Sequence, residues 1–146
     1  MFLEAPAREG VIHVYLRFVS SEIDWETGVR AGVFNVAYDL FYSGRLPVYE
    51  CERLRDIFDW FGENLKQPRR FSRWPCVGRP NKAICWFRPT AREHLSRARE
   101  MIALLEDYDV LIWTLKASKV GYVVYEDEHQ VVAEPYADTR LEVLLV

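Results

Sequence analysis

The sequence has little cysteine, and none of it forms a paired motif. Its three cysteines, Cys51, Cys76 and Cys85, are odd in number and far apart. Disulfide frameworks and zinc sites need an even or closely spaced set, so this pattern favours reduced thiols in a cytoplasmic protein. The sequence also has no His-x-x-x-His and no His-Glu-x-x-His motif. We therefore expect neither a bound metal ion nor a cofactor.

Long apolar runs are absent as well. No stretch of the sequence approaches the ~20 consecutive apolar residues that span a bilayer. Residues 1–10 have neither the basic start nor the apolar centre of a signal peptide. We therefore expect no membrane association and a cytoplasmic location.

Motifs of common reactions and an excess of basic charge are also lacking. The sequence has no Walker loop, no Gly-x-Gly-x-x-Gly and no Gly-x-Ser-x-Gly, so no reaction can be assigned from a motif. It has 19 Lys and Arg against 22 Asp and Glu, a net charge of −3. Because general duplex binding requires basic side chains that displace counterions, this balance disfavours a nucleic-acid partner.

Apolar and aromatic residues are plentiful. They make up 50% and 14% of the 146 residues, which is ample for one packed domain. We expect a single domain over 1–146, with ragged ends at 1–9 and 137–146. The last residues, 141–146, are apolar apart from Glu142 and are either a final strand or a tail.

Hydrophobic periodicity predicts a strand and two helices in the first half. Branched and aromatic residues over 11–18 predict the strand. Apolar residues at helical spacing predict a helix over 26–42, which two glycines weaken. A second helix between Pro47 and Pro68 has a clear apolar stripe: Leu54, Ile57, Phe58, Phe61 and Leu65. Together the two helices form a predicted αα-hairpin.

The second half predicts one helix and four strands. Residues 83–87 and 110–115 read as strands around a helix that starts with the capping-box pattern Thr90-Ala-Arg-Glu93. Such a unit predicts parallel strands with a right-handed crossover. Residues 122–133 predict a β-hairpin with a polar turn. The sequence thus predicts an α+β fold with a mixed sheet of four or five strands. The expected order is strand–helix–helix–strand–helix–strand–strand–strand, with helices mainly on one face.

Three segments resemble parts of uncharacterised small bacterial proteins. They are residues 31–65, Ala83-Ile-Cys-Trp-Phe-Arg-Pro-Thr-Ala-Arg-Glu-His-Leu95, and Gly121-Tyr-Val-Val-Tyr-Glu-Asp-Glu-His-Gln-Val-Val-Ala-Glu-Pro135. The resemblance implies a bacterial origin and a single-domain protein. It implies no activity, cofactor or catalytic residue.

The connection over residues 66–82 is long, irregular and basic. It contains three prolines, one glycine and no acidic residue, so regular structure is not expected. Arginine forks bind phosphate or carboxylate groups, and aromatic rings stack on bases. The predicted binding residues are Arg69, Arg70, Phe71, Arg73, Trp74, Arg79 and Lys82. In the alternative interpretation, this segment is a solvated loop without a binding role. Its arginines then form ion pairs with the acidic faces of the helices, and its two aromatic rings pack into the core.

Two further clusters contain groups that can do chemistry. Glu126, Asp127 and Glu128 are consecutive, and neighbouring turn residues point in different directions, so we expect a polar turn instead of a metal site. Cys85 and His94 flank a strand-to-helix connection and are the candidate thiol–base pair. The strand position of Cys85 favours a buried, inert thiol.

Two hypotheses follow. The first is a non-enzymatic binding or regulatory module that recognises a protein partner or an anionic surface through residues 66–82, with self-association as a sub-case. The alternative is a small enzyme acting on a nucleotide, nucleic acid or other anionic substrate. In that enzyme Glu128, Glu134, His94 or His129 would be the acid or base. If residues 66–82 lie over a pocket that also contains one of these four groups, the enzyme hypothesis is favoured. If they project as a convex arm, the binding module is favoured.

Overall fold

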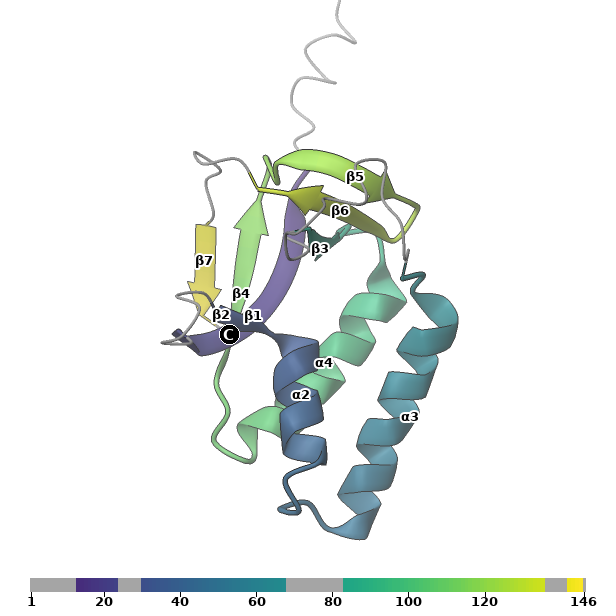
Figure 1. Cartoon of the computed structure of the whole chain (residues 1–146), viewed down its shortest axis with the longest axis vertical. Helices are drawn as coiled ribbons and strands as arrows, with labels where there is room; N and C mark the ends of the chain where they lie inside the picture. Colours follow the sequence, from purple (N-terminus) through teal and green to yellow (C-terminus); the bar gives the residue numbers. More distant parts are fainter. Residues whose placement is uncertain (1–12, 24–29, 68–82, 136–141, 146) are drawn as a thin grey trace, which may run out of the picture.

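A curled antiparallel sheet carries three helices on one face in the described part of the chain (Figure 1). The computed structural model describes residues 13–23, 30–67, 83–135 and 142–145. Its elements are β1 (Tyr15–Ile23), β2 (Arg30–Gly32), α2 (Val33–Phe41), α3 (Val48–Asn64), β3 (Ile84–Phe87), α4 (Arg92–Glu106), β4 (Ile112–Ala117), β5 (Tyr122–Glu126), β6 (Gln130–Glu134) and β7 (Glu142–Leu145). The predicted α+β class, the order of the elements and the helices on one face are confirmed.

The sheet order is β5-β6-β3-β1-β4-β7, with β2 beside β1. Every pairing among the described strands is antiparallel, whereas a mixed sheet of four or five strands was expected. The strands β3 and β4 do run in the same direction, as the crossover through α4 requires. They are not paired because β1 lies between them, antiparallel to both.

The sheet separates two apolar clusters. On the helical side, Phe18 and Phe87 pack among the buried residues of all three helices. On the other side, Val19, Trp86 and Leu115 form a second cluster inside the curl of the sheet. Adjacent residues such as Phe18 and Val19 enter different clusters because strand side chains alternate between the two faces.

The helix α3 matches its predicted apolar stripe, and α4 also buries one face. Buried residues of α3 include Leu54, Ile57 and Phe61, and those of α4 include Ala98, Ile102 and Leu105. The predicted capping box is wrong, because α4 begins after Ala91 and no side chain caps it. A tight backbone turn precedes the helix instead. None of the described helices is long and apolar enough to cross a membrane.

The chain departs from its predicted boundaries around the first helix. That helix begins at Val33 and not near position 26, because residues 30–32 pair with β1 as β2. Gly32 ends β2 with an extended conformation, φ −69° and ψ 159°, and is the N-cap of α2. At the other end of the chain, β7 pairs with β4, so a final strand describes residues 142–145 better than a tail.

Gly121 has no space for a side chain. Its φ is +118°, and a Cβ atom there would overlap the carbonyl group of Glu134 and stand 2.7 Å from the Cα of Pro135. We expect Gly121→Ala to lower the free energy of unfolding by at least ~2 kcal/mol, because strain and overlap add. Urea denaturation measures this difference.

Gly62 is the matched control for Gly121. It lies inside α3, and a Cβ atom there would meet no other atom within 4 Å. We expect Gly62→Ala to raise the free energy of unfolding by up to ~1 kcal/mol, because alanine favours the helix. Equal effects of the two substitutions would contradict the close approach at Gly121.

Candidate functional site

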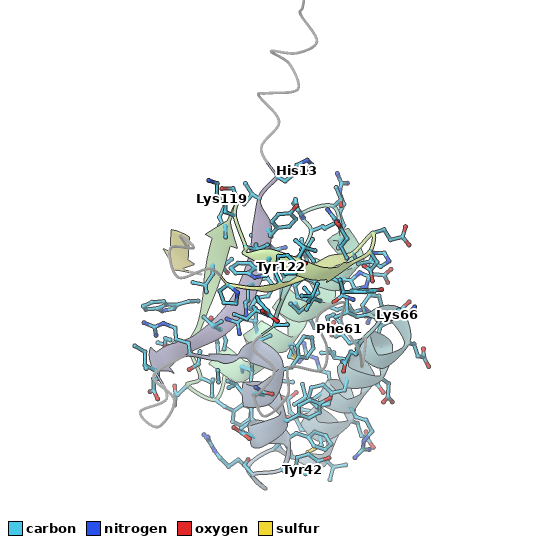
Figure 2. The ribbon with its side chains drawn as sticks, turned by 45° about the horizontal axis from the view of Figure 1, so that its top comes forward. His13, Tyr42, Phe61, Lys66, Lys119 and Tyr122 are labelled. Atoms are coloured by element: carbon cyan, nitrogen blue, oxygen red, sulfur yellow. The ribbon has the colours of Figure 1, made fainter. Side chains whose placement is uncertain are left out.

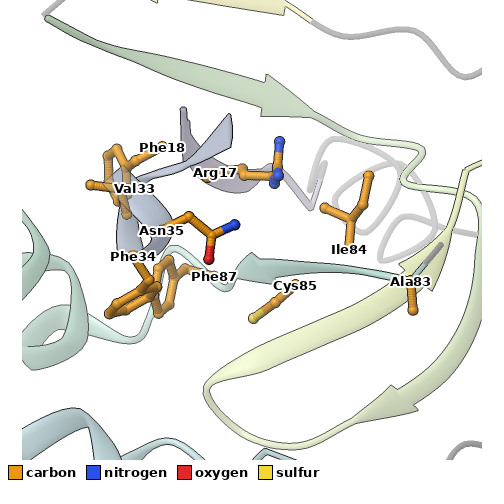
Figure 3. Close-up of a pocket in the computed structure, with 10 residues that line it drawn as sticks. Arg17, Phe18, Val33, Phe34, Asn35, Ala83, Ile84, Cys85 and Phe87 are labelled. Atoms are coloured by element: carbon orange, nitrogen blue, oxygen red, sulfur yellow. The ribbon is translucent and has the colours of Figure 1, made fainter. Parts of the chain in front are cut away.

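One edge of β1 changes its neighbour partway along the strand. β1 pairs with β3 at Leu16 opposite Phe87, and with β2 at Val19 opposite Gly32. Because β2 continues directly into α2, that helix begins where β1 and β3 separate. A pocket of about 230 Å³ lies in this opening (Figure 3). Its lining residues are Arg17, Phe18, Gly32, Val33, Phe34, Asn35, Ala83, Ile84, Cys85 and Phe87.

Arg17 supplies the positive charge of the pocket. Its side chain is half-buried, and its Nη2 atom lies 3.5 Å from where a Cβ atom on Gly32 would stand. Among the described residues, no carboxylate pairs with Arg17 and no group accepts a hydrogen bond from it. Burial lowers the pKa of Arg17, while the Cys85 thiol acts in the opposite direction. The guanidinium nevertheless stays protonated at neutral pH.

The start of α2 adds a second source of positive potential. No side chain caps this helix, and its first turn contains no acidic residue. Its first N–H groups therefore lack partners within the helix and carry the positive end of the helix dipole. A cation beside a helix N-terminus is electrostatically unfavourable on its own. A bound carboxylate or phosphate would interact favourably with both groups.

The rest of the pocket is mostly apolar. The apolar lining residues are Phe18 of β1, Val33 and Phe34 of α2, and Ile84 and Phe87 of β3. The side chain of Asn35 is exposed and brings an amide to the pocket. Figure 3 shows the polar ends of Arg17 and Asn35 reaching the same space from different elements. The pocket thus combines a polar, cationic side with apolar walls.

Cys85 lines the pocket as a protonated thiol. Burial raises its pKa to about 12, although Arg17 opposes this shift and Asp127 adds to it. Its Sγ atom donates to Oε1 of Gln130 over 3.0 Å. Since the thiolate is the reactive form, the raised pKa keeps Cys85 in its less reactive form at neutral pH. Its side chain is half-buried, whereas a fully buried thiol was expected from its strand position.

The candidate base His94 has other partners. It is buried, and its Nε2 atom lies 2.7 Å from the carbonyl oxygen of Asn64 at the end of α3. Its ring stacks on that of His129, with ring centroids 4.2 Å apart. The ring of Trp60 meets it edge-on from the other side. His94 therefore joins α3, α4 and the β5–β6 turn, and it does not line the pocket.

The acidic hairpin is a hydrogen-bonded turn. Oδ1 of Asp127 accepts from the backbone N–H groups of His129 and Gln130, at 2.8 and 3.0 Å. Oδ2 of Asp127 accepts from the Tyr125 hydroxyl at 2.9 Å and from Nε2 of Gln130 at 3.2 Å. Burial raises the pKa of Asp127, but these hydrogen bonds outweigh it and hold the pKa below its usual value. Both carboxylate oxygens of Asp127 thus accept hydrogen bonds within the turn and stabilise it.

The neighbouring carboxylates of Glu126 and Glu128 are both paired with basic side chains. Arg88 donates from Nη2 to Glu126 and from Nε to the Asp127 carbonyl, both at 2.7 Å. Glu128 is exposed and lies 3.3 Å from Nε2 of His129. In the described part of the chain, no group of three or more His, Cys, Asp or Glu residues is arranged to hold a metal ion.

The predicted basic binding residues lie outside the described part of the chain. This applies to Arg69, Arg70, Phe71, Arg73, Trp74, Arg79 and Lys82. The residues that flank them are described. Lys66 follows α3 (Figure 2). Its carbonyl oxygen accepts from Nε2 of Gln130 at 2.6 Å. On the other flank, Ala83 lines the pocket. The prediction for this basic segment therefore stays a prediction, with one flank at the pocket.

Sequence reasoning missed Arg17, Gly32 and Asn35. A weak signal existed, because Arg17 interrupts an apolar strand and Gly32 precedes a helix that has no acidic first turn. Neither signal identifies a pocket until β1, β3 and α2 are placed together.

Comparisons with known proteins assign neither a family nor a function to this chain. No family model matches the chain, and neither a curated protein nor a solved structure is significantly similar to it. The resemblance to small bacterial proteins therefore stays a prediction, and function has to be argued from the geometry.

The Asp127 turn yields a prediction on stability. Asp127→Ala removes four accepted hydrogen bonds, and we expect it to lower the free energy of unfolding by roughly 2 kcal/mol. Glu128→Ala is the matched control on the next residue, and we expect it to change stability by less than ~0.5 kcal/mol. Urea denaturation at neutral pH compares the two. Similar losses would show that the turn does not depend on Asp127.

The lowered pKa of Asp127 also predicts a pH dependence. Between the folded and unfolded pKa values the unfolded chain binds more protons, so the contribution of Asp127 to stability grows as pH rises. It is complete above about pH 5 and is lost as pH falls through the lowered folded value. Denaturation curves of the Asp127→Asn variant should show a weaker acid dependence than those of the parent chain. Identical pH profiles would contradict an ionised Asp127 in the turn.

Proposed function

We propose that this domain is a non-enzymatic binding module that holds a small anionic ligand in the pocket between β1 and β3. One observation carries the proposal. Half-buried Arg17 lies against the uncapped start of α2, and no described residue supplies the negative charge that this place favours. A ligand anion would neutralise Arg17 and would accept from N–H groups of the first turn of the helix.

Binding without chemistry is favoured over the enzyme hypothesis. None of the four candidate acids and bases, Glu128, Glu134, His94 and His129, is among the described lining residues of the pocket. The one nucleophile there, Cys85, has a pKa of about 12 and therefore stays a thiol at neutral pH. The pocket thus has groups that hold an anion and no described group poised to transfer a proton.

The basic segment extends this proposal. Its predicted residues, Arg69 to Lys82, end one position before Ala83, which lines the pocket. Arginines in that segment would raise the local concentration of anions, or would contact an acidic protein partner once the pocket is filled. We further propose that this regulatory module is a bacterial cytoplasmic protein and that it can self-associate.

Substitution of Arg17 tests the proposal. Arg17→Met keeps the length of the side chain and removes its charge. We expect small anions, added as sodium salts at constant ionic strength, to raise the melting temperature of the parent chain and not that of Arg17→Met. A lost charge-assisted interaction corresponds to roughly a tenfold to hundredfold loss of affinity. In the absence of anions, Arg17→Met should be about 0.3–1 kcal/mol more stable, because a cation leaves the helix N-terminus.

Arg53→Met is the matched control. Arg53 is exposed on α3 and pairs with Glu50 and Glu100, away from the pocket. We expect this variant to keep the full response to anions. Equal anion responses in all three proteins would overturn the pocket as the binding site. A large loss of stability in Arg17→Met without anions would make Arg17 a structural residue.

A further inference from the structure

We infer that the ligand is a small monocarboxylate with an aromatic or branched apolar body. This inference rests on the proposed function and names the chemical class that the same pocket accepts. It follows from three properties of the pocket: its single described positive charge, its apolar lining and its volume.

The charge of the pocket matches a single negative charge. Arg17 is the one cationic side chain among the described lining residues, and no acidic side chain opposes it. A guanidinium donates two parallel N–H hydrogen bonds to the two oxygens of one carboxylate group. A phosphate monoester carries nearly two charges at neutral pH, and phosphate sites meet that charge with several cations or a glycine-rich loop, whereas the described lining residues include one arginine. One arginine and one helix start therefore favour a carboxylate.

The walls of the pocket favour an apolar body. Phe34 meets Phe61 edge-on with ring centroids 4.9 Å apart, and Phe87 lies 6.1 Å from Phe18. These ring contacts hold two walls of the pocket in place, so an apolar ligand would meet a preformed surface. A bare anion such as inorganic phosphate would leave this surface in contact with water. The larger part of the ligand is therefore apolar.

The size of the pocket limits the ligand. A dry cavity of about 150 Å³ in another protein binds benzene. The pocket here, at about 230 Å³, is larger by roughly half and so holds a six-membered ring with about three further non-hydrogen atoms. A carboxylate group contributes three such atoms. Benzoate therefore represents the upper size of ligand that fits without rearrangement.

Asn35 selects for the carboxylate at the mouth of the pocket. It is the third residue of α2, exposed, and its amide reaches the same space as Arg17 (Figure 3). In that position an amide can donate to a carboxylate oxygen while the guanidinium binds the group from the other side. An aspartate at the same position would repel the ligand, yet it would suit the first turn of the helix.

Calorimetric titration of the full chain tests this inference with four probes. Benzoate is the expected ligand, and benzyl alcohol is the neutral comparison of similar size. Inorganic phosphate tests the charge and the apolar body. Phenyl phosphate, which is larger than benzoate by two non-hydrogen atoms, tests the charge together with the size limit. We expect benzoate to bind one to one, at least tenfold more tightly than each of the other probes. In Arg17→Met and in Asn35→Asp, benzoate affinity should fall at least tenfold, while Asn35→Asp keeps or raises the melting temperature.

The outcomes separate this inference from the proposed function. If phenyl phosphate or inorganic phosphate binds as tightly as benzoate and Arg17→Met abolishes it, the anion pocket stands and the carboxylate class is overturned. If benzyl alcohol binds the parent chain as tightly as benzoate, and benzoate keeps its affinity in both variants, the pocket is merely apolar and both ideas fail. If no probe binds and no anion stabilises the parent chain, both ideas are likewise overturned. Should Arg17→Met fail to fold, Asn35→Asp decides the carboxylate class alone.

Discussion

The continuous ladder between β1 and β4 is the constraint on which the rest of the structure depends. Six residues in a row, Tyr15–Ser20, pair with β4. This register sends Phe18 toward the helices and Val19 toward the second cluster. The other edge of β1 is divided between β3 and β2, and the pocket lies at the division. Arg17 and Phe18 are adjacent, so their side chains point to opposite faces of the sheet, yet both line the pocket. The pocket therefore lies at the edge of β1, where side chains from both faces can reach it.

A polar network around the buried side chain of Gln130 holds one side of the pocket in place. Gln130 is 2% exposed, and its amide contacts the Cys85 thiol, the Lys66 carbonyl and Asp127. Each of these contacts satisfies a group that would be costly to bury alone. Together they tie the end of α3 to β3 and β6. The position of Ile84 and Cys85 at the pocket therefore depends on a network that takes no part in the proposed binding.

Helices and hairpins were predictable from the sequence, and strand partners were not. The stripe of α3 and the hairpin of β5 and β6 depend on local periodicity, which survives in a single sequence. The start of α2 was wrong because residues 30–32 pair with β1, a partner distant in the sequence. The capping box failed for a similar reason, since a backbone turn at the end of β3 already sets the entry to α4.

The sequence by itself determined the α+β class and the order of the elements. These follow from side-chain pattern and residue chemistry, which are local properties. Only the tertiary structure decided that His94 stacks on His129 and that Arg17 meets the start of α2. Those contacts join segments far apart in the chain, and their geometry is set by strand register and packing. A single sequence does not encode that geometry as a readable pattern.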